Sequence, residues 1–548
     1  MRGLMQDLPL TLPHLFVRAE RLYGDKDVLT AGITGQHRTT YSAWADRTRR
    51  LGTALDTLQI SAGGRVGTFA WNTARHLELY FAAPCTGRVL HTLNIRLSSE
   101  QLVYVVNHAE DEVVFVDRSL AELLFPHVAQ LTTVKHIVVM DDGPGDLPPL
   151  ADGPAVHDYE ALIADAEPAE LRVDDEWRAA MMCYTSGTTG NPKGVVYTHR
   201  STYLHTLGVT AAGGLGIREA DRVLPVVPMF HANAWGLAHA AVATGASLIL
   251  PGPDLSPPAI ADLVESERVT VAAGVPTIWM GMLPELEGRD VSSLRAIICG
   301  ASAVPRALSE SYRAAIGLPI LQAWGMTETS PLGSVCHIKS TLDARLDDDQ
   351  RADLRTSVGQ PVVGVEARIC RPGDTGPPEP LPWDGATAGA LQVRGPWIAA
   401  GYYDDPRSPD SFTPDGWLDT GDVATIDPDG YIRIVDRTKD VIKSGGEWIS
   451  SIGIENELMA HPEVSEAAVI GIAHERWGER PLAFVVLMGR SDASEDDLRA
   501  FLGARLPRWW VPEDFVFIDQ IPKTSVGKFA KRELRALFAE GHPTSSAG

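Results

Sequence analysis

The sequence YTSGTTGNPKG occupies residues 184–194 and directly follows the apolar run 179–183. A strand that leads into a loop of Gly, Ser and Thr places backbone N–H groups, hydroxyl groups and one lysine together, and these groups bind phosphate oxygens. The stretch is not a Walker loop, because Lys193 follows Pro192 and Gly194 stands where Ser or Thr would bind magnesium. A solvated turn is the alternative, but three glycines, four Ser/Thr hydroxyls and a lysine favour a polyphosphate site.

Outward from this loop, short runs rich in Val and Ile alternate with helical stretches through most of the chain. The runs at 66–71, 112–117 and 247–250 predict strands, and residues 99–108 and 259–267 predict helices. This alternation is typical of α/β layers with substantial parallel sheet. We therefore predict a large α/β domain.

The pattern changes in the last third of the sequence. Pro and Gly are dense in residues 372–382, which predicts a small β-rich subdomain beginning near Asp353. Residues 436–450 read DRTKDVIKSGGEWIS, and the strands and helices after them form a unit of about a hundred residues, an ordinary domain size. The predicted division is a large N-terminal domain over 1–435, a hinge linker over 436–440 and a small C-terminal domain over 441–548.

Composition narrows the class of protein. The 548 residues are 44% hydrophobic and 22% charged with a net charge of −23, which disfavours nucleic acid and anionic lipid as partners. The five scattered cysteines form no CxxC pair, so neither a disulfide framework nor a zinc site is indicated. The N-terminus lacks the apolar stretch of a secretory peptide, and the apolar run 235–251 is too short to span a bilayer. We expect a cytoplasmic protein without a transmembrane segment.

The phosphate loop resembles that of the acyl-adenylate-forming superfamily, which groups acyl-CoA synthetases, peptide-synthetase adenylation domains and beetle luciferase. The opening residues and PMFHANAWG at 228–236 are most similar to medium- and long-chain fatty acyl-CoA synthetases, and this likeness covers nearly the whole chain. Four further motifs follow in the superfamily's order: GMTETSP at 325–331, GWLDTGD at 416–422, DRTKDVIKSGGEWIS at 436–450 and PKTSVGKFAKRELR at 522–535.

The resemblance implies an acid:CoA ligase that uses ATP, Mg²⁺ and coenzyme A. A carboxylate attacks the α-phosphate of ATP to give acyl-AMP and pyrophosphate, and the thiol of coenzyme A then displaces AMP. Negative charge accumulates on phosphoryl oxygens in the first transition state, so preorganised cations and donors stabilise it. The resemblance also implies two α/β layered subdomains, a small β-rich subdomain and a small mobile α+β C-terminal domain. Likeness to dimeric long-chain synthetases makes a homodimer a reasonable expectation.

The motifs give several residues roles by likeness to the superfamily. Lys528 bridges the substrate carboxylate and the α-phosphate, although a basic solvated face is the alternative for this region. Thr185 and Glu328 hold Mg²⁺, Asp422 accepts the ribose hydroxyls, and Arg437 contacts the ribose. The expected ATP or AMP residues are Thr185, Ser186, Gly187, Thr188, Thr189, Gly190, Lys193, Gly300, Ala301, Gln322, Ala323, Trp324, Gly325, Met326, Thr327, Asp422, Arg437, Lys439, Lys443, Trp448 and Lys528.

The adenine pocket and the hinge carry further expectations from the resemblance. Trp324 stands where the superfamily usually has Tyr, which keeps a flat aromatic face for stacking on adenine and loses the phenol. Lys439 matches the pivot about which the C-terminal domain swings between the two half-reactions. The expected acyl and coenzyme A residues are His231, Ala232, Trp235, Ser444, Gly445 and Gly446.

The sequence leaves the acid open. Residues 230–236 contain no carboxylate to pair an ammonium, so amino acids are disfavoured, and a medium- or long-chain fatty acid is expected. Trp235 is either a gate to the alkyl tunnel or a core residue, and His231 either orients the acyl group or thiol or is structural. The methyl group of Ala323, where Gly is usual, would shorten the tunnel, so a short, branched, sulfur-containing or aryl acid stays possible. Rival functions are an acyl-AMP ligase that loads a carrier protein and a non-enzymatic nucleotide or acyl-AMP sensor.

Overall fold

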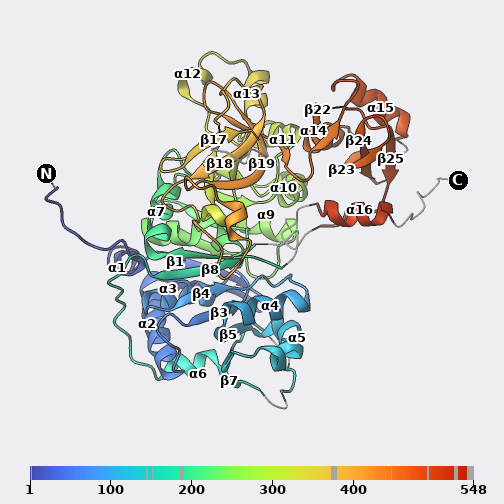
Figure 1. The fold of residues 1–548 in the computed structure, drawn as a ribbon. Helices are drawn as coiled ribbons and strands as arrows, with labels where there is room; N and C mark the ends of the chain where they lie inside the picture. Colours follow the sequence, from blue (N-terminus) through green and yellow to red (C-terminus); the bar gives the residue numbers. More distant parts are fainter. Residues whose placement is uncertain are drawn as a thin grey trace.

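The computed structural model describes residues 1, 3–143, 146–150, 153–185, 191–371, 379–445, 447–489, 491, 493–523 and 529–539. Two large sheets, a β-rich subdomain and a small C-terminal domain make up this part of the chain, and the small domain lies to one side of the rest (Figure 1). The predicted α/β fold with an α+β C-terminal domain is confirmed. No helix of the described residues combines the length and apolar character that crossing a membrane requires.

The first large sheet has the strand order β7-β6-β5-β3-β4-β8-β9 and is parallel except for the β8–β9 pair. Its central strands are buried along nearly their whole length, as expected for parallel strands covered on both faces. The strands are β3 (Arg65–Phe69), β4 (Val89–Thr92), β5 (Asp111–Asp117), β6 (His136–Met140), β7 (Ala155–Asp158), β8 (Ala179–Tyr184) and β9 (Gly194–Thr198).

The second large sheet has the order β16-β15-β14-β13-β12-β10-β11-β1-β2, with a parallel centre and antiparallel edges. The sequence-predicted strand at 247–250 coincides with β11. The strands are β1 (Asp27–Gly32), β2 (Gly35–Thr40), β10 (Arg222–Pro225), β11 (Ser247–Leu250), β12 (Val271–Gly274), β13 (Ala296–Cys299), β14 (Leu321–Gly325), β15 (Leu332–Val335) and β16 (Gln360–Pro361).

Helices α3 and α8 contact strands of the large sheets and are buried nearly all round, so one hydrophobic core joins the two sheets. Helix α4 begins with a capping box between Ser98 and Gln101, which satisfies backbone donors at its N-terminus. The helices of the large domain are α1 (Leu12–Leu22), α2 (Tyr41–Thr57), α3 (Ala74–Cys85), α4 (Ser99–Ala109), α5 (Ala121–Leu124), α6 (Tyr159–Ala164), α7 (His199–Thr210), α8 (Leu237–Thr244), α9 (Pro257–Ser266), α10 (Pro276–Met282), α11 (Arg306–Ile316), α12 (Ser340–Asp343) and α13 (Asp348–Leu354).

Two smaller sheets complete the fold. The β-rich subdomain is an antiparallel sheet of β17 (Glu366–Cys370), β18 (Gly389–Arg394), β19 (Leu418–Ile426) and β20 (Ile432–Arg437). The C-terminal domain contains β21 (Ile442–Ser444), β22 (Glu447–Ile449), α14 (Ser451–Met459), β23 (Val464–His474), β24 (Gly478–Leu487), α15 (Glu495–Gly503), β25 (Asp514–Phe517) and α16 (Lys531–Ala539). The last strand of the large domain, β20, therefore ends in the segment that leads into the small domain.

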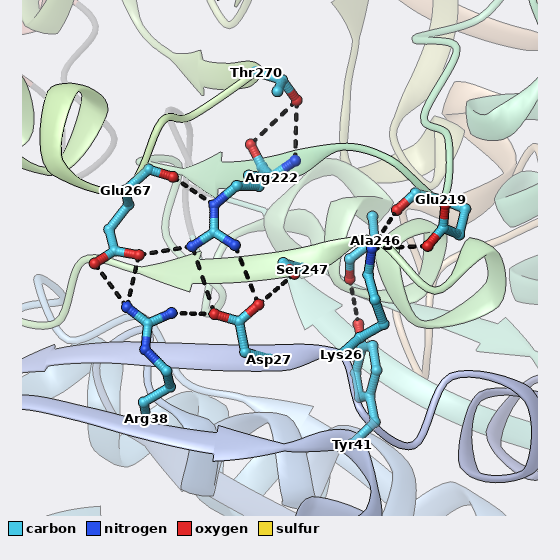
Figure 2. A network of polar contacts seen from close by, with 10 residues as sticks. All are labelled: Lys26, Asp27, Arg38, Tyr41, Glu219, Arg222, Ala246, Ser247, Glu267 and Thr270. Atoms are coloured by element: carbon cyan, nitrogen blue, oxygen red, sulfur yellow. Dashed lines mark hydrogen bonds and ion pairs between the residues drawn. The ribbon is translucent and has the colours of Figure 1, made fainter. Parts of the chain in front are cut away.

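A network of alternating charges ties together the amino ends of β1, β10 and β11 (Figure 2). Arg222 contacts Asp27 at 3.2 Å and Glu267 at 2.6 Å, and Arg38 contacts the same two carboxylates. Burial by itself raises the pKa of Asp27, but the hydrogen bond from Ser247 and the charge of Arg222 outweigh it and hold the pKa below its ordinary value. The network holds the sheet at the edge opposite to the carboxyl ends of its parallel strands.

We expect Arg222→Met to lower the free energy of unfolding by about 2 kcal/mol at pH 7, because Asp27 and Glu267 would lose the guanidinium between them. The lowered pKa of Asp27 stabilises the fold above the ordinary carboxyl pKa, and this contribution is lost as pH falls through the folded pKa. The difference in unfolding free energy between the wild type and Arg222→Met should therefore become smaller below about pH 4. Thermal unfolding at pH 7 and at pH 3.5 measures both effects.

Arg172→Met is the matched control, because Arg172 and Asp174 form an exposed pair at 2.8 Å. Exposed pairs contribute about 0–1 kcal/mol, so its unfolding midpoint should stay near that of the wild type. A deficit of Arg222→Met that is the same at both pH values would contradict the contribution assigned to Asp27.

Candidate active site

The strands β8 and β9 form a hairpin that holds the two ends of the predicted phosphate loop together. The N–H of Thr185 donates to the Lys193 carbonyl at 2.9 Å, and the Lys193 N–H donates to the Thr185 hydroxyl at 3.1 Å. A Cβ on Gly194 would lie 2.6 Å from the end of the Met182 side chain, so a larger residue there would require that side chain to move. Five predicted phosphate residues, Ser186, Gly187, Thr188, Thr189 and Gly190, lie outside the described residues.

Tyr402 links this loop to Glu328. Its hydroxyl donates to Glu328 Oε1 at 2.6 Å, and the Lys193 ammonium lies 4.3 Å from the centre of its ring. The Lys193 ammonium also lies 3.4 Å from the Ser411 hydroxyl. Burial, followed by the nearby charge of Glu328, raises the pKa of Tyr402 well above its ordinary value, so the phenol stays a donor. Tyr402 is not predicted from the sequence, because GYYDDP carries no spacing that distinguishes it from other aromatic residues.

Glu328 lies in a short turn, Thr327–Thr329, and its residue is only 5% exposed. The turn is fixed on both sides: Tyr197 donates to the Thr327 carbonyl at 2.8 Å, and the Ala399 N–H donates to the Glu328 carbonyl at 2.8 Å. No group of three or more His, Cys, Asp or Glu side chains in the described part of the chain is arranged to bind a metal ion. One carboxylate and one hydroxyl suit Mg²⁺ that arrives with nucleotide phosphates, since that ion takes few protein ligands there.

Asp422 joins two other predicted nucleotide residues at the carboxyl end of β14. Its carboxylate is 2% exposed and contacts the Arg437 Nε at 2.9 Å, directly across the β19–β20 ladder. The Trp324 indole N–H donates to the second Asp422 oxygen at 3.1 Å. The structure thus brings Trp324, Asp422 and Arg437 together, and their nucleotide roles stay predictions.

Comparison with known proteins assigns this constellation to a family. The AMP-binding enzyme model matches residues 16–403, and the AMP-binding enzyme C-terminal domain model matches residues 453–528. The chain belongs to the AMP-binding enzyme family. It is an AMP-forming acyl-CoA ligase, which excludes the non-enzymatic sensor.

Relatives of this chain match it over nearly its full length. It is 44% identical to a long-chain-fatty-acid–CoA ligase of Thermus thermophilus, covering 97% of this chain and 96% of the relative. It is 43% identical to a 3-methylmercaptopropionyl-CoA ligase of Ruegeria lacuscaerulensis, covering 98% of this chain and 99% of the relative. Among solved structures, ATP-bound MatB from Rhodopseudomonas palustris is similar with a TM-score of 0.80 at 27% identity. The match covers 96% of this chain and 99% of MatB.

In this ligase the predicted adenine and acyl segments lie side by side. A Cβ on Gly300 would come within 3.0 Å of the Ala323 carbonyl and 3.2 Å of the Trp235 ring, so these three residues are in contact range. Gln322 accepts a hydrogen bond from the Val304 N–H at 3.3 Å and supports the loop after β13. The remaining predicted residues Ala301, Gly325, Met326 and Thr327 lie on the same two segments.

The predicted acyl segment has an unusual backbone. The run 235–251 predicts a buried helix followed by a strand, but the helix begins at Leu237, and Trp235 belongs to a left-handed turn. Ala232, Asn233, Ala234 and Trp235 have φ values of 42°, 53°, 51° and 56°. Each left-handed non-glycine residue costs roughly 1–2 kcal/mol, so surrounding contacts must hold the turn in place.

Contacts around the turn explain how it persists. Asn233 is buried, and its side-chain oxygen accepts from the Cys183 thiol at 3.3 Å, which ties the turn to β8. The preceding residue, His231, is half-buried, and its N–H donates to the Pro228 carbonyl at 3.1 Å. No pattern of residue types predicts consecutive left-handed residues, so this geometry was beyond sequence reasoning.

The C-terminal hairpin β21–β22 carries the remaining predicted residues. Lys443 pairs with Trp448 across the hairpin, the Ser444 hydroxyl accepts from Arg480 at 3.4 Å, and Gly445, at φ 61°, lies against the Trp477 ring. These contacts of Lys443, Ser444 and Gly445 are all made with residues of the small domain. Gly446 and Lys528 lie outside the described residues.

The predicted hinge is bounded by a buried polar cluster. Asp436, at 1% exposure on β20, accepts from the Ser451 N–H at 2.7 Å and from its hydroxyl, and so satisfies a backbone donor at the first residue of helix α14. The Lys531 ammonium reaches the same hydroxyl and pairs with Glu455 at 2.6 Å. Burial lowers the pKa of the predicted pivot, Lys439. The cluster connects the last strand of the large domain to the helix after the Lys528 loop.

We expect Lys531→Met to destabilise the small domain by about 3 kcal/mol, because it leaves the Glu455 carboxylate buried without its cation. Hydrogen exchange should rise in helices α14 and α16 while exchange in the large sheets stays unchanged. Lys523→Met is the control, since Lys523 pairs with Glu466 at the surface. Unchanged exchange in α14 after Lys531→Met would show that the buried pair contributes little.

Proposed function

We propose that this ligase activates a medium- or long-chain fatty acid as acyl-AMP and then forms the acyl-CoA thioester. The observation that carries the proposal is near full-length identity of 44% to a long-chain and 39% to a medium-chain fatty acid–CoA ligase, the latter from Ectopseudomonas oleovorans. Trp235, packed beside Gly300, provides an apolar wall for an acyl chain. A homodimer and a cytoplasmic location remain predictions.

The proposed chemistry assigns each part of the site one task. Lys193 binds the pyrophosphate portion, Asp422 accepts the ribose hydroxyls, and Trp324 stacks on adenine. Glu328 and Thr185 would hold Mg²⁺, which neutralises phosphate charge when it is bound with ATP. Lys528, delivered by the small domain about the Lys439 hinge, stabilises the charge that develops on the α-phosphate.

A second candidate substrate is a short sulfur-containing acid. The support is 43% identity to a 3-methylmercaptopropionyl-CoA ligase, which is nearly the same as the identity to the fatty acid ligase. The methyl group of Ala323, at a position where Gly is usual, also favours a shorter slot. Near-equal identities do not separate the two acids, so the substrate must be measured directly.

The deciding experiment is a competition panel with the full-length protein, ATP, Mg²⁺ and coenzyme A. The acids are acetate, hexanoate, octanoate, dodecanoate, palmitate, 3-methylmercaptopropionate and benzoate. Acid-dependent exchange of labelled pyrophosphate into ATP reports adenylation, and mass spectrometry identifies the thioester. We expect the highest kcat/KM between octanoate and palmitate. A maximum at 3-methylmercaptopropionate, or thioester formation on a carrier protein in place of coenzyme A, would overturn the proposal.

A further inference from the structure

The side chain of Trp324 bonds to another predicted nucleotide residue, Asp422. Its indole N–H donates to Asp422 Oδ2 at 3.1 Å, although the two residues lie on different sheets. Arg437 contacts the other Asp422 oxygen at 2.9 Å. The carboxylate is therefore held from both sides by donors whose own positions are set by β14 and β20.

The backbone opposite Trp324 is shaped to admit an indole. In the β14–β15 ladder Trp324 pairs with Ser334 and Gly325 with Leu332, so Gly333 is the extra residue of a β-bulge. A Cβ on Gly333 would lie 2.5 Å and 2.7 Å from two carbons of the Trp324 ring. Bulges next to active sites re-aim side chains, and here the bulge places a residue without a side chain beneath the ring.

We propose that Trp324 is a positioning residue for Asp422, in addition to offering its face to adenine. An ionised carboxylate has about four acceptor positions, so one carboxylate can accept both from an indole N–H and from ribose hydroxyls. A tyrosine carries its hydroxyl at the far end of the ring, whereas the indole N–H leaves from the side of the ring. With Trp in place of Tyr, the ring's polar hydrogen is therefore the indole N–H, and it donates to the Asp422 carboxylate. The inference rests on the proposed ribose contact of Asp422.

Nucleotide affinity tests the inference without knowledge of the acid. Calorimetric titration of the full-length protein with Mg²⁺ and ATP, 2′-deoxy-ATP or 3′-deoxy-ATP measures what each ribose hydroxyl contributes to Kd. We expect the wild type to bind either deoxynucleotide at least about tenfold more weakly than ATP, as for a hydrogen bond to a charged group. Trp324→Phe keeps an aromatic face and loses the N–H. In this variant the ratio of Kd for a deoxynucleotide to Kd for ATP should be at least about threefold smaller than in the wild type.

Gly333→Ala gives an independent arm of the test. The added Cβ would displace the indole, so Gly333→Ala alone should lower the ratio of Kd for deoxy-ATP to Kd for ATP. Added to Trp324→Phe, the same substitution should change this ratio little further. Trp383→Phe, an indole 44% exposed outside the predicted nucleotide residues, should leave the ratio unchanged. Unfolding midpoints identify any variant that fails to fold, and Trp324→Phe then stands as the deciding variant.

The outcomes separate the inference from the proposal on which it rests. A wild type that discriminates between ATP and deoxy-ATP, together with a Trp324→Phe variant that keeps the same ratio, overturns the positioning role alone. A wild type that binds all three nucleotides equally overturns the ribose contact of Asp422 and the inference with it. A narrowed ratio in both Trp324→Phe and Gly333→Ala supports the inference.

Discussion

Lys528→Ala is expected to slow acyl-AMP formation at least about 1,000-fold and to leave thioester formation from supplied acyl-AMP within about threefold of the wild type. The adenylation transition state gathers negative charge on the α-phosphate, and alanine removes the cation that we propose to meet it. In the second half-reaction the same lysine would obstruct the thiol, so its loss should matter little. Acid-dependent pyrophosphate exchange measures the first step, and release of AMP from synthetic acyl-AMP measures the second.

Lys523→Ala is the matched control for Lys528→Ala. Lys523 belongs to the same basic segment, but its ammonium pairs with Glu466 at 2.6 Å on the surface of the small domain. Both half-reactions should stay near wild-type rates in this variant. Equal loss of the two half-reactions in Lys528→Ala would contradict the swinging-domain account, because that account gives the lysine a role in only one step.

The sequence predicted the layered architecture well because buried strands leave a simple hydrophobic signal. The strand at 247–250 was predicted at its observed bounds, since it is a short apolar run between turn residues. The conformation of residues 232–235 was not predicted, because their left-handed backbone is stabilised by distant contacts such as that of Cys183 with Asn233. Local preference carries no record of such contacts.

The candidate site was predicted as a set of motifs and not as a set of contacts. The motifs predicted roles for Glu328, Asp422 and Arg437, and the family match supports the ligase chemistry while these roles stay predictions. They did not identify Tyr402, which lies outside every motif and becomes visible only through its bonds to Glu328 and Lys193. They also could not reveal the bond between Trp324 and Asp422, which depends on how two separate sheets meet.

Glu328→Gln is expected to lower the adenylation rate by about 100–1,000-fold, because a neutral amide cannot replace the carboxylate that we propose to hold Mg²⁺ against the phosphates. The volume of the side chain is nearly unchanged, and the amide oxygen can still accept from the Tyr402 hydroxyl, so the fold should be preserved. Adenylation measured against Mg²⁺ concentration should show a raised half-saturation point, whereas the unfolding midpoint should not move.

Tyr402→Phe separates the orientation of the Glu328 carboxylate from its charge. The variant keeps the ring face beneath Lys193 and removes the hydroxyl that bonds to Glu328 Oε1. With the charge intact and one orienting bond lost, adenylation should fall by only about tenfold, the size of one hydrogen bond to a charged group. The Mg²⁺ requirement should rise in the same direction as in Glu328→Gln. A Glu328→Gln variant with unchanged Mg²⁺ dependence would place the metal on other groups, and the bond from Tyr402 would then serve the fold alone.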